Sequence, residues 1–397
     1  MTQDIVPVSS PRILWLQVIA LALVQGTISL TWLIYNSYLP KLLGDFGFSK
    51  ELAVNLIILE NTLAIVMEPL FGGLSDRKQR WLGTRFPFIT AGAIASSALF
   101  IAIPSIVTFF QPSVVSRSFL PILLVAWSFA MTIFRSPAIA LLGRYAQVPE
   151  LPLAVSLLTL TGGIVAAFKP VASKFILGFS PIFAFTLGSL VLLGACGVLR
   201  YVSPPPRPDL EIPLEAENTT IPIQSLAFIF ATGCGIAWGS RLVTEIFSKT
   251  LQAQFRGEST DILMLWIGLV MAIAAIPAGI FAVKIGNAKA MIGGIVAIIP
   301  AMFLIVYVGI NIGTLILAVA AYSLILNGVI PFALSSVSSR WSGLVIGIYF
   351  GGFSLAMALF PIVFPSLGEI TPLGGAIGAA LAFVMAAACI ASIPKSS

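Results

Sequence analysis

The sequence lacks histidine altogether and holds only three cysteines among 397 residues. Without histidine it has neither the commonest metal ligand nor the usual proton shuttle near neutral pH. The cysteines, Cys196, Cys234 and Cys389, lie singly in apolar stretches, so they form neither a CxxC metal site nor a disulfide framework. A phosphate-binding loop and a nucleophile–base pair are also missing. We therefore expect no metal, no cofactor and no enzymatic activity.

Charged residues are scarce too, at 9% of the chain, against about 25% for a soluble domain. Hydrophobic residues make up 58%, and a soluble fold of this size would need far more polar surface. The sequence therefore predicts an integral membrane protein. The 21 basic residues outnumber the 15 acidic ones, but they lie in short segments between apolar runs. That placement indicates membrane orientation rather than nucleic-acid binding.

Twelve apolar segments are long enough to cross a bilayer as helices of about 20 residues. The predicted spans are 13–39, 51–74, 87–110, 119–143, 150–175, 180–202, 224–248, 261–283, 290–310, 312–338, 342–366 and 372–392. The first exceeds the apolar core of a signal peptide, about 7–15 residues, so it counts as a span. A polar, proline-rich stretch at 203–223 is typical of a linker. It divides the chain into six-helix units at 1–202 and 224–397.

The basic residues also indicate the orientation of the chain. If both termini are cytoplasmic, twelve bases lie on the inner side and six on the outer side. Because cytoplasmic loops carry an excess of lysine and arginine, we expect a monomeric, multi-pass protein of the cell inner membrane with both termini inside. Proline motifs at Pro69 and Pro277, and at Pro137 and Pro331, recur at corresponding places in the two halves. This recurrence is what parallel six-helix repeats predict.

A charged segment with a distinctive spacing follows the second predicted span. It runs from Gly73 through Asp76 and Arg77 to Gly83 and Arg85. Glycines permit tight turns and close helix approach, and the aspartate can pair with nearby bases. The segment resembles the signature loop of the major facilitator superfamily. That resemblance implies an all-α fold of twelve transmembrane helices in two pseudo-repeats, which rock around a midplane site, with these five residues forming a gating loop.

A finer resemblance extends to both sides of this loop. Glu68-Pro69 before it, and the Phe134-Arg135-Ser136-Pro137 motif of the fourth span, are similar to those of the glycoside-pentoside-hexuronide:cation symporters and the sucrose–proton symporters. The resemblance implies that Glu68 stands where the glycoside carriers have a cation-binding acid. Those carriers often have a second acid one turn earlier, where this chain has Ala64. The loss favours proton coupling over sodium coupling.

Three ionisable residues inside the predicted spans are candidates for coupling. A charge at bilayer depth costs at least about 2.5–3.5 kcal/mol, so it needs a partner or water. Glu60 and Glu68 share a face of the second span, and Arg135 lies at a depth that matches Glu68. Burial favours the protonated carboxyl and a nearby guanidinium favours the carboxylate. We predict that Glu68 exchanges between a proton and Arg135; the alternative is a permanent structural ion pair.

Polar faces on otherwise apolar helices indicate a solute site, because such a face must point into protein or water. The first span carries one at i, i+4, i+7 and i+11, and by the resemblance spans 1, 4, 7 and 10 line the central cavity. An aromatic ring with amide and charged donors suits a polyhydroxylated solute, although tryptophan is also common at membrane interfaces. The candidate solute-binding residues are Gln25, Trp32, Asn36, Ser128, Trp238, Arg241, Glu245 and Asn327.

Glycines spaced by four at Gly343, Gly347 and Gly351 predict a close-packing face, either purely structural or part of a rocking interface. The favoured function is secondary active transport of a small solute, a sugar or glycoside, by proton-coupled symport. The partners expected are therefore a solute, a coupling cation and the lipid bilayer, but no nucleic acid. Two alternatives stay open: an efflux carrier for an apolar compound, and a non-transporting pigment-delivery factor of photosynthetic membranes, whose corresponding loop is similar.

Overall fold

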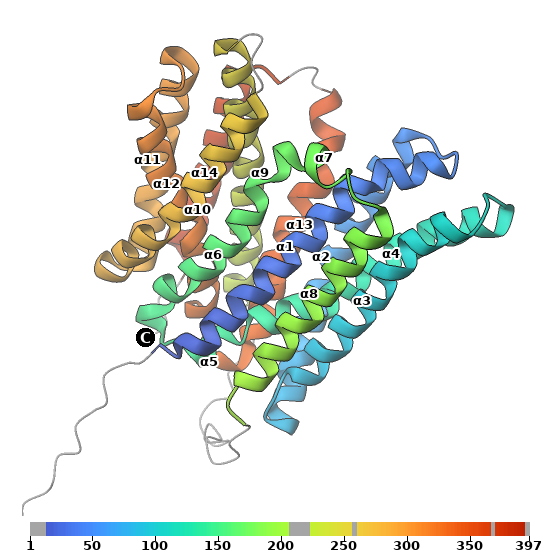
Figure 1. The fold of residues 1–397 in the computed structure, drawn as a ribbon. Coiled ribbons are helices and arrows are strands. Elements are labelled where there is room, and N and C mark those ends of the chain that lie inside the picture. Colours follow the sequence, from blue (N-terminus) through green and yellow to red (C-terminus); the bar gives the residue numbers. More distant parts are fainter. Residues whose placement is uncertain (1–12, 206–222, 256–259, 367–369, 394–397) are drawn as a thin grey trace, which may run out of the picture.

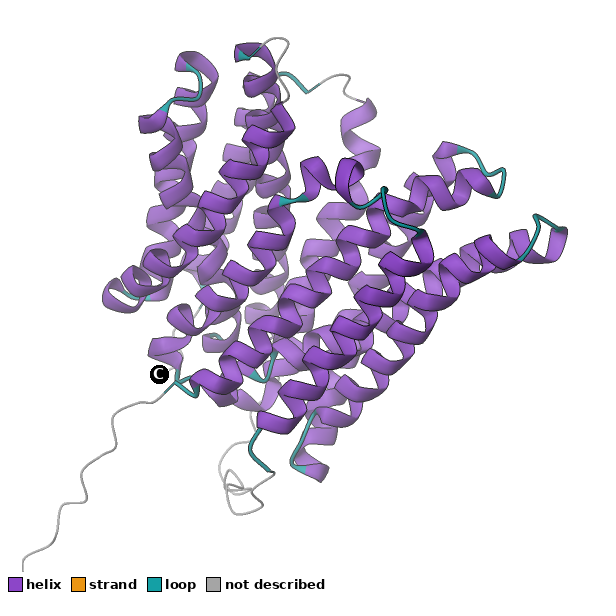
Figure 2. Cartoon of the chain, in the orientation of Figure 1, coloured by secondary structure: helices purple, strands orange, loops and turns teal. Residues whose placement is uncertain are grey.

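A computed structural model describes residues 13–205, 223–255, 260–366 and 370–393. These residues form helices joined by short loops, as Figure 2 shows. The α-helices are α1 (Trp15–Asp45), α2 (Lys50–Leu82), α3 (Phe86–Phe109), α4 (Val114–Ile139), α5 (Leu142–Tyr145), α6 (Leu151–Ala167), α7 (Ala172–Phe175), α8 (Pro181–Val202), α9 (Ile223–Gln254), α10 (Thr260–Ile285), α11 (Asn287–Val308), α12 (Ile312–Ser335), α13 (Ser342–Ser366) and α14 (Pro372–Ser392). Short 3₁₀ turns are η1 (Val148–Glu150), η2 (Lys169–Val171) and η4 (Ser339–Trp341).

Twelve spans among the described residues are long and apolar enough to cross a membrane. They follow the twelve predicted segments in order, so the prediction of an all-α, twelve-span fold is confirmed. Their bounds differ in two informative places. α2 continues to Leu82 instead of ending at residue 74, and the fifth predicted span, 150–175, breaks into α6, η2 and α7. Pro170, which lies within η2, explains the break because proline cannot donate the hydrogen bond that an α-helix needs.

The helices gather into two groups that meet along two pairs. α1, α2, α3, α4, α6 and α8 pack among themselves, as do α9 to α14, and the main contacts between the groups join α2 to α13 and α6 to α10. We call the side at which α8 ends and α9 begins the linker side. In Figure 1 the groups are close together toward the linker side and spread apart toward the opposite side. The predicted linker at 203–223 lies almost entirely outside the described residues, and the predicted domain limits stay a prediction.

Glycines allow α2 and α13 to touch through their backbones. A methyl group on Gly72 would overlap the carbonyl oxygen of Gly343, and one on Gly347 would overlap the carbonyl oxygen of Glu68. Gly351 continues the row, where an added methyl would lie 2.9 Å from the carbonyl oxygen of Ile65. The face predicted from the glycine spacing is therefore in contact with the other half of the molecule. Such small-residue contacts replace the hydrophobic driving force that helices lack inside lipid.

Candidate functional site

The buried ion pair between α2 and α4 lies where the two halves approach each other. Arg135 Nη2 is 2.6 Å from Glu68 Oε1, and the Ser136 hydroxyl donates a hydrogen bond to the other carboxylate oxygen. The Glu68 side chain is fully buried, whereas 18% of the Arg135 side chain is exposed. The two charges that we expected at matching depth are thus in contact. One of them keeps access to solvent.

A cavity of about 140 Å³ lies next to this pair, between the two halves. Its polar lining includes Gln25 of α1 and Thr159 of α6, and its far wall includes Tyr349 and Phe350 of α13. The Arg135 guanidinium lies over the Phe350 ring, 4.2 Å from its centroid, in a cation–π contact. Phe350 therefore touches both the cavity and the ion pair, so a solute in the cavity and the charge state of the pair can influence each other.

Glu60 lies in a different environment, within the first half. The Tyr35 hydroxyl donates a hydrogen bond to its carboxylate, and Glu60 makes no ion pair with any residue that the structure describes. The Tyr35 ring stacks on Trp127 with a centroid distance of 4.4 Å, and Phe100 stacks on Trp127 at 4.9 Å. This buried carboxyl thus has a phenol and aromatic rings around it, an environment that suits the neutral acid better than the anion.

The candidate solute-binding residues of the first half fall in separate places. Gln25 lines the central cavity, whereas Trp32 packs against Tyr35 and Trp127 in the aromatic cluster. Asn36 is exposed and donates a hydrogen bond of 2.8 Å to the carbonyl of Trp32 in its own helix. Ser128 is buried within α4. The regular spacing along α1 therefore does not lead to a single binding surface.

The candidates of the second half also divide between packing and charge. Trp238 packs against Phe360 and Phe364, with ring centroids 5.7 and 5.5 Å away. Asn327 is fully buried and donates a hydrogen bond to the carbonyl of Ala275, so it joins α12 to α10. Arg241 and Glu245 form an ion pair of 2.9 Å along one face of α9. Both keep exposed surface, with 37% and 25% of their side chains accessible.

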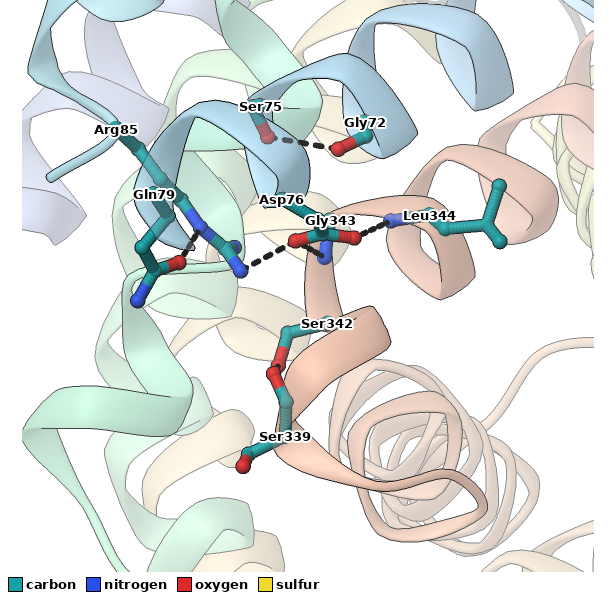
Figure 3. A network of polar contacts seen from close by, with 9 residues as sticks. All are labelled: Gly72, Ser75, Asp76, Gln79, Arg85, Ser339, Ser342, Gly343 and Leu344. Atoms are coloured by element: carbon teal, nitrogen blue, oxygen red, sulfur yellow. Dashed lines mark hydrogen bonds and ion pairs between the residues drawn. The ribbon is translucent and has the colours of Figure 1, made fainter. Parts of the chain in front are cut away.

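The linker side is closed by a network around Asp76, shown in Figure 3. One Asp76 oxygen accepts the backbone N–H of Gly343 at 2.9 Å, and the other accepts that of Leu344 at 2.8 Å. Arg85 donates to the same carboxylate at 2.5 Å, and it also donates to the side chain of Gln79. Asp76 thereby occupies the N-terminal end of α13, where unpaired N–H groups and the helix dipole favour a negative charge. One carboxylate of the first half therefore binds the start of α13 in the second half.

The predicted gating loop is mostly helical, which corrects our expectation. α2 continues through Asp76 and the exposed Arg77, and only Gly83, with φ of +65°, ends it in the left-handed conformation. No proline or other helix breaker stands between Gly73 and Leu82, so the helix continues past the apolar segment. Gly73 lies inside α2, and the glycine that permits the close backbone approach is its neighbour Gly72.

Arg85 is a buried charge whose partner is Asp76. Burial lowers the pKa of its guanidinium, and the Asp76 carboxylate raises it. Because arginine remains protonated in proteins, the positive charge stays and needs its carboxylate. The pair therefore fixes the turn between α2 and α3 against the start of α13.

Removal of the Asp76 charge is expected to destabilise the protein strongly. Asp76→Asn leaves Arg85 buried without a carboxylate, and breaking a buried pair on one side costs about 3–5 kcal/mol. Thermal unfolding of the detergent-solubilised protein measures the loss. The matched control is Asp261→Asn, because Asp261 forms an ion pair with Lys174 in which 43% of the Asp261 side chain is exposed. Equal melting temperatures of the two variants would contradict a structural role for the Asp76 charge.

Comparison with known families identifies the chain. The sequence model of the Major Facilitator Superfamily matches residues 21–361. The chain belongs to this family, and it is therefore a multi-pass membrane transporter with a small-molecule substrate, not an enzyme. No curated protein matches the sequence.

Solved structures resemble the fold over almost the whole chain. The human organic anion transporter MFSD10 is 17% identical, covers 94% of this chain and 99% of its own, and gives a TM-score of 0.65. FucP in its outward conformation is 12% identical, with coverage of 95% and 98% and a TM-score of 0.69. A second FucP structure, from the E. coli fucose:proton symporter, is 11% identical, with coverage of 97% and 100% and a TM-score of 0.69. At these identities the likeness concerns the fold.

Several residues of the site were missed by sequence reasoning. Ser136 binds Glu68 and stands directly beside the predicted Arg135, so its place in the motif was an available signal. Tyr35 binds Glu60, but a tyrosine near the end of a predicted span is equally typical of a membrane interface. Tyr349 and Phe350 lie in an aromatic pair on α13, and nothing in their spacing distinguishes them from core residues.

Proposed function

We propose that this protein is a proton-coupled secondary transporter that moves a sugar or glycoside by symport. The observation that carries the proposal is the position of the Glu68–Arg135 pair. The pair is built from the first half of the molecule, it lies beside a cavity between the halves, and one partner is open to solvent. We also propose that the linker side faces the cytoplasm, because most of the basic residues that flank the spans lie there.

Exchange of partners at Glu68 would supply the coupling. In the present conformation the carboxylate is paired with Arg135 and with Ser136. A proton on Glu68 would release the guanidinium, which already lies against Phe350 at the cavity wall. The released cation could then bind a solute hydroxyl, since charge-assisted hydrogen bonds are about twice as strong as neutral ones. Protonation and solute binding would therefore favour each other.

The lining of the cavity suits the proposed solute class. Its volume of about 140 Å³ is close to the roughly 150 Å³ that holds a benzene-sized molecule in an engineered protein cavity, so in the present conformation it has room for part of a sugar. Gln25 and Thr159 offer hydrogen-bonding groups, and Tyr349 offers an aromatic ring, which suits the polar edge and the apolar face of a sugar ring. Fucose–proton symport, which FucP carries out, is a reaction of the kind that we propose.

Uptake of a labelled sugar panel into proteoliposomes tests the function. An imposed pH gradient with the acidic side outside, which drives protons inward, is expected to drive accumulation of at least one sugar or glycoside above its external concentration. A sodium gradient of equal size should not drive it. Accumulation that follows sodium alone would reject proton coupling, and a panel without any transported member would reject the solute class.

A further inference from the structure

Phe350 connects the ion pair of the first half with the second half. The residue belongs to α13, and the centroid of its ring is 4.2 Å from the guanidinium of Arg135 in α4. α4 and α13 are in contact. Gly347 and Gly351, which flank Phe350 in the sequence, pack directly against the backbone of α2. The ring therefore cannot stay with Arg135 if α13 moves away from α2.

Arg135 has one partner in each half of the molecule. Glu68 is the one carboxylate within ion-pair distance of it among the described residues, and Phe350 is the one ring that its guanidinium covers there. The Nε–H group of Arg135 is buried and has no acceptor within the described part of the chain. A cation is attracted by the face of an aromatic ring, most strongly where water is excluded. The guanidinium is thus held by a carboxylate and a ring, and it keeps a donor for a further partner.

Opening on the linker side would break only one of these two contacts. Glu68 and Arg135 both belong to the first half, so their ion pair can persist, whereas the ring leaves with α13. The loss is greatest when Glu68 is protonated, because the guanidinium then has neither a carboxylate nor a ring, and a charge at this depth needs a partner. A solute oxygen bound to Arg135 would replace the ring through a charge-assisted hydrogen bond.

We propose that Phe350 is a positioning residue that holds Arg135 from the second half and keeps the empty transporter closed on the linker side until a bound solute replaces the ring. The inference rests on the proposed transport function and concerns the regulation of its site. If Glu68 carries the coupled proton, the ring also limits proton leak, because it restrains the protonated transporter that holds no solute.

Maleimide modification of Ser75→Cys in the purified protein measures the opening, because Ser75 is fully buried where α2 meets α13. Without solute, Phe350→Leu should increase the modification rate by about 2- to 30-fold, the range that a cation–π contact represents. Phe350→Met, another apolar side chain without a ring, should have the same effect. Phe350→Tyr keeps the ring and should retain the original rate.

Phe360→Leu is the matched control on the same helix. The centroid of the Phe360 ring is 5.3 Å from the guanidinium of Arg241, so this variant also removes a cation–π contact. Arg241 lies in α9, within the second half, and the contact therefore does not join the two halves. Phe360→Leu should leave the modification rate of Ser75→Cys unchanged.

A charge test separates the cation–π contact from simple packing. In the Glu68→Gln/Arg135→Gln background no guanidinium faces the ring, so Phe350→Leu should no longer change the modification rate. Such a double-mutant cycle isolates the interaction between the two side chains. A rate that Phe350→Leu leaves unchanged in the original chain, or raises equally in this background, would overturn the proposal.

Proton leak into proteoliposomes without solute relates the ring to coupling. In Phe350→Leu the leak should rise within the same range of about 2- to 30-fold. The modification assay needs neither protons nor a transported sugar, so its failure is separate from the failure of proton coupling. A faster modification with an unchanged leak would uphold the role of Phe350 and reject proton exchange at Glu68.

Discussion

Glu68→Gln is expected to abolish solute accumulation driven by a pH gradient, with a fall in uphill uptake of about tenfold or more. Glutamine resembles the protonated carboxyl and can still accept the hydrogen bond that Ser136 donates, but it cannot exchange a proton. Exchange of labelled for unlabelled solute without a gradient should persist, because that reaction needs no net proton movement. Both rates can be measured in the same proteoliposomes over a range of pH.

A matched control separates coupling from stability. Glu51→Gln changes an exposed acid on the same helix and should accumulate solute normally. The double variant Glu68→Gln/Arg135→Gln removes the unpaired guanidinium that the single variant would leave, so it should regain stability and remain uncoupled. If the double variant is stable and still concentrates solute in response to pH, the pair is structural and the coupling proposal is wrong.

Most of the fold could be predicted from the sequence because the bilayer limits the structures that a spanning segment can adopt. An apolar run of about 20 residues in lipid must be helical, since every backbone group needs an internal partner. Twelve such runs therefore predict twelve spans, and the structure has them. The end of α2 was missed because hydropathy locates the edge of the apolar run, whereas a helix ends where a breaker stands. Here that breaker is Gly83.

The site could be predicted from the sequence only where its residues carry opposite charges at the same depth in the membrane. Glu68 and Arg135 could be paired because opposite charges at one depth in adjacent helices have few other partners. The bonds from Asp76 to Gly343 and Leu344 join residues 267 and 268 positions apart. No local pattern contains that information. Asn327 lies on a span that was predicted to line the central cavity. Its side chain donates a hydrogen bond to the carbonyl of Ala275 in α10 and joins two helices of the second half.

The glycine contact between α2 and α13 offers a way to measure the conformational change. The backbones touch at Gly72 and Gly343 and again at Gly347 and Glu68. If the proposed function holds, α2 and α13 must separate on the linker side when the protein opens there. An added side chain that fits when α2 and α13 are apart, but not when they are in contact, should therefore shift the balance toward the open state. It should not affect the helices themselves.

Gly347→Ala is expected to favour the state that is open on the linker side. Its methyl group would overlap the backbone carbonyl of Glu68, and overpacking of this kind costs about 1–3 kcal/mol. If only the state closed on the linker side has this cost, the ratio of the open state to the closed state rises by about 5- to 150-fold. The measurement is the rate at which maleimide modifies Ser75→Cys, because Ser75 is fully buried at this contact, bonded to the carbonyl of Gly72 at 2.7 Å. Modification should accelerate and transport should fall.

Gly293→Ala is the matched control, since an added methyl there meets no atom within 4 Å. It should leave both modification and transport unchanged, and it can add up to about 1 kcal/mol of helix stability. A Gly347→Ala variant whose Ser75→Cys label reacts at the original rate would show that α2 and α13 accommodate the methyl group without separating. In that case the glycine row is a packing feature only, and the movement between the halves must occur at α6 and α10, the other pair that joins them.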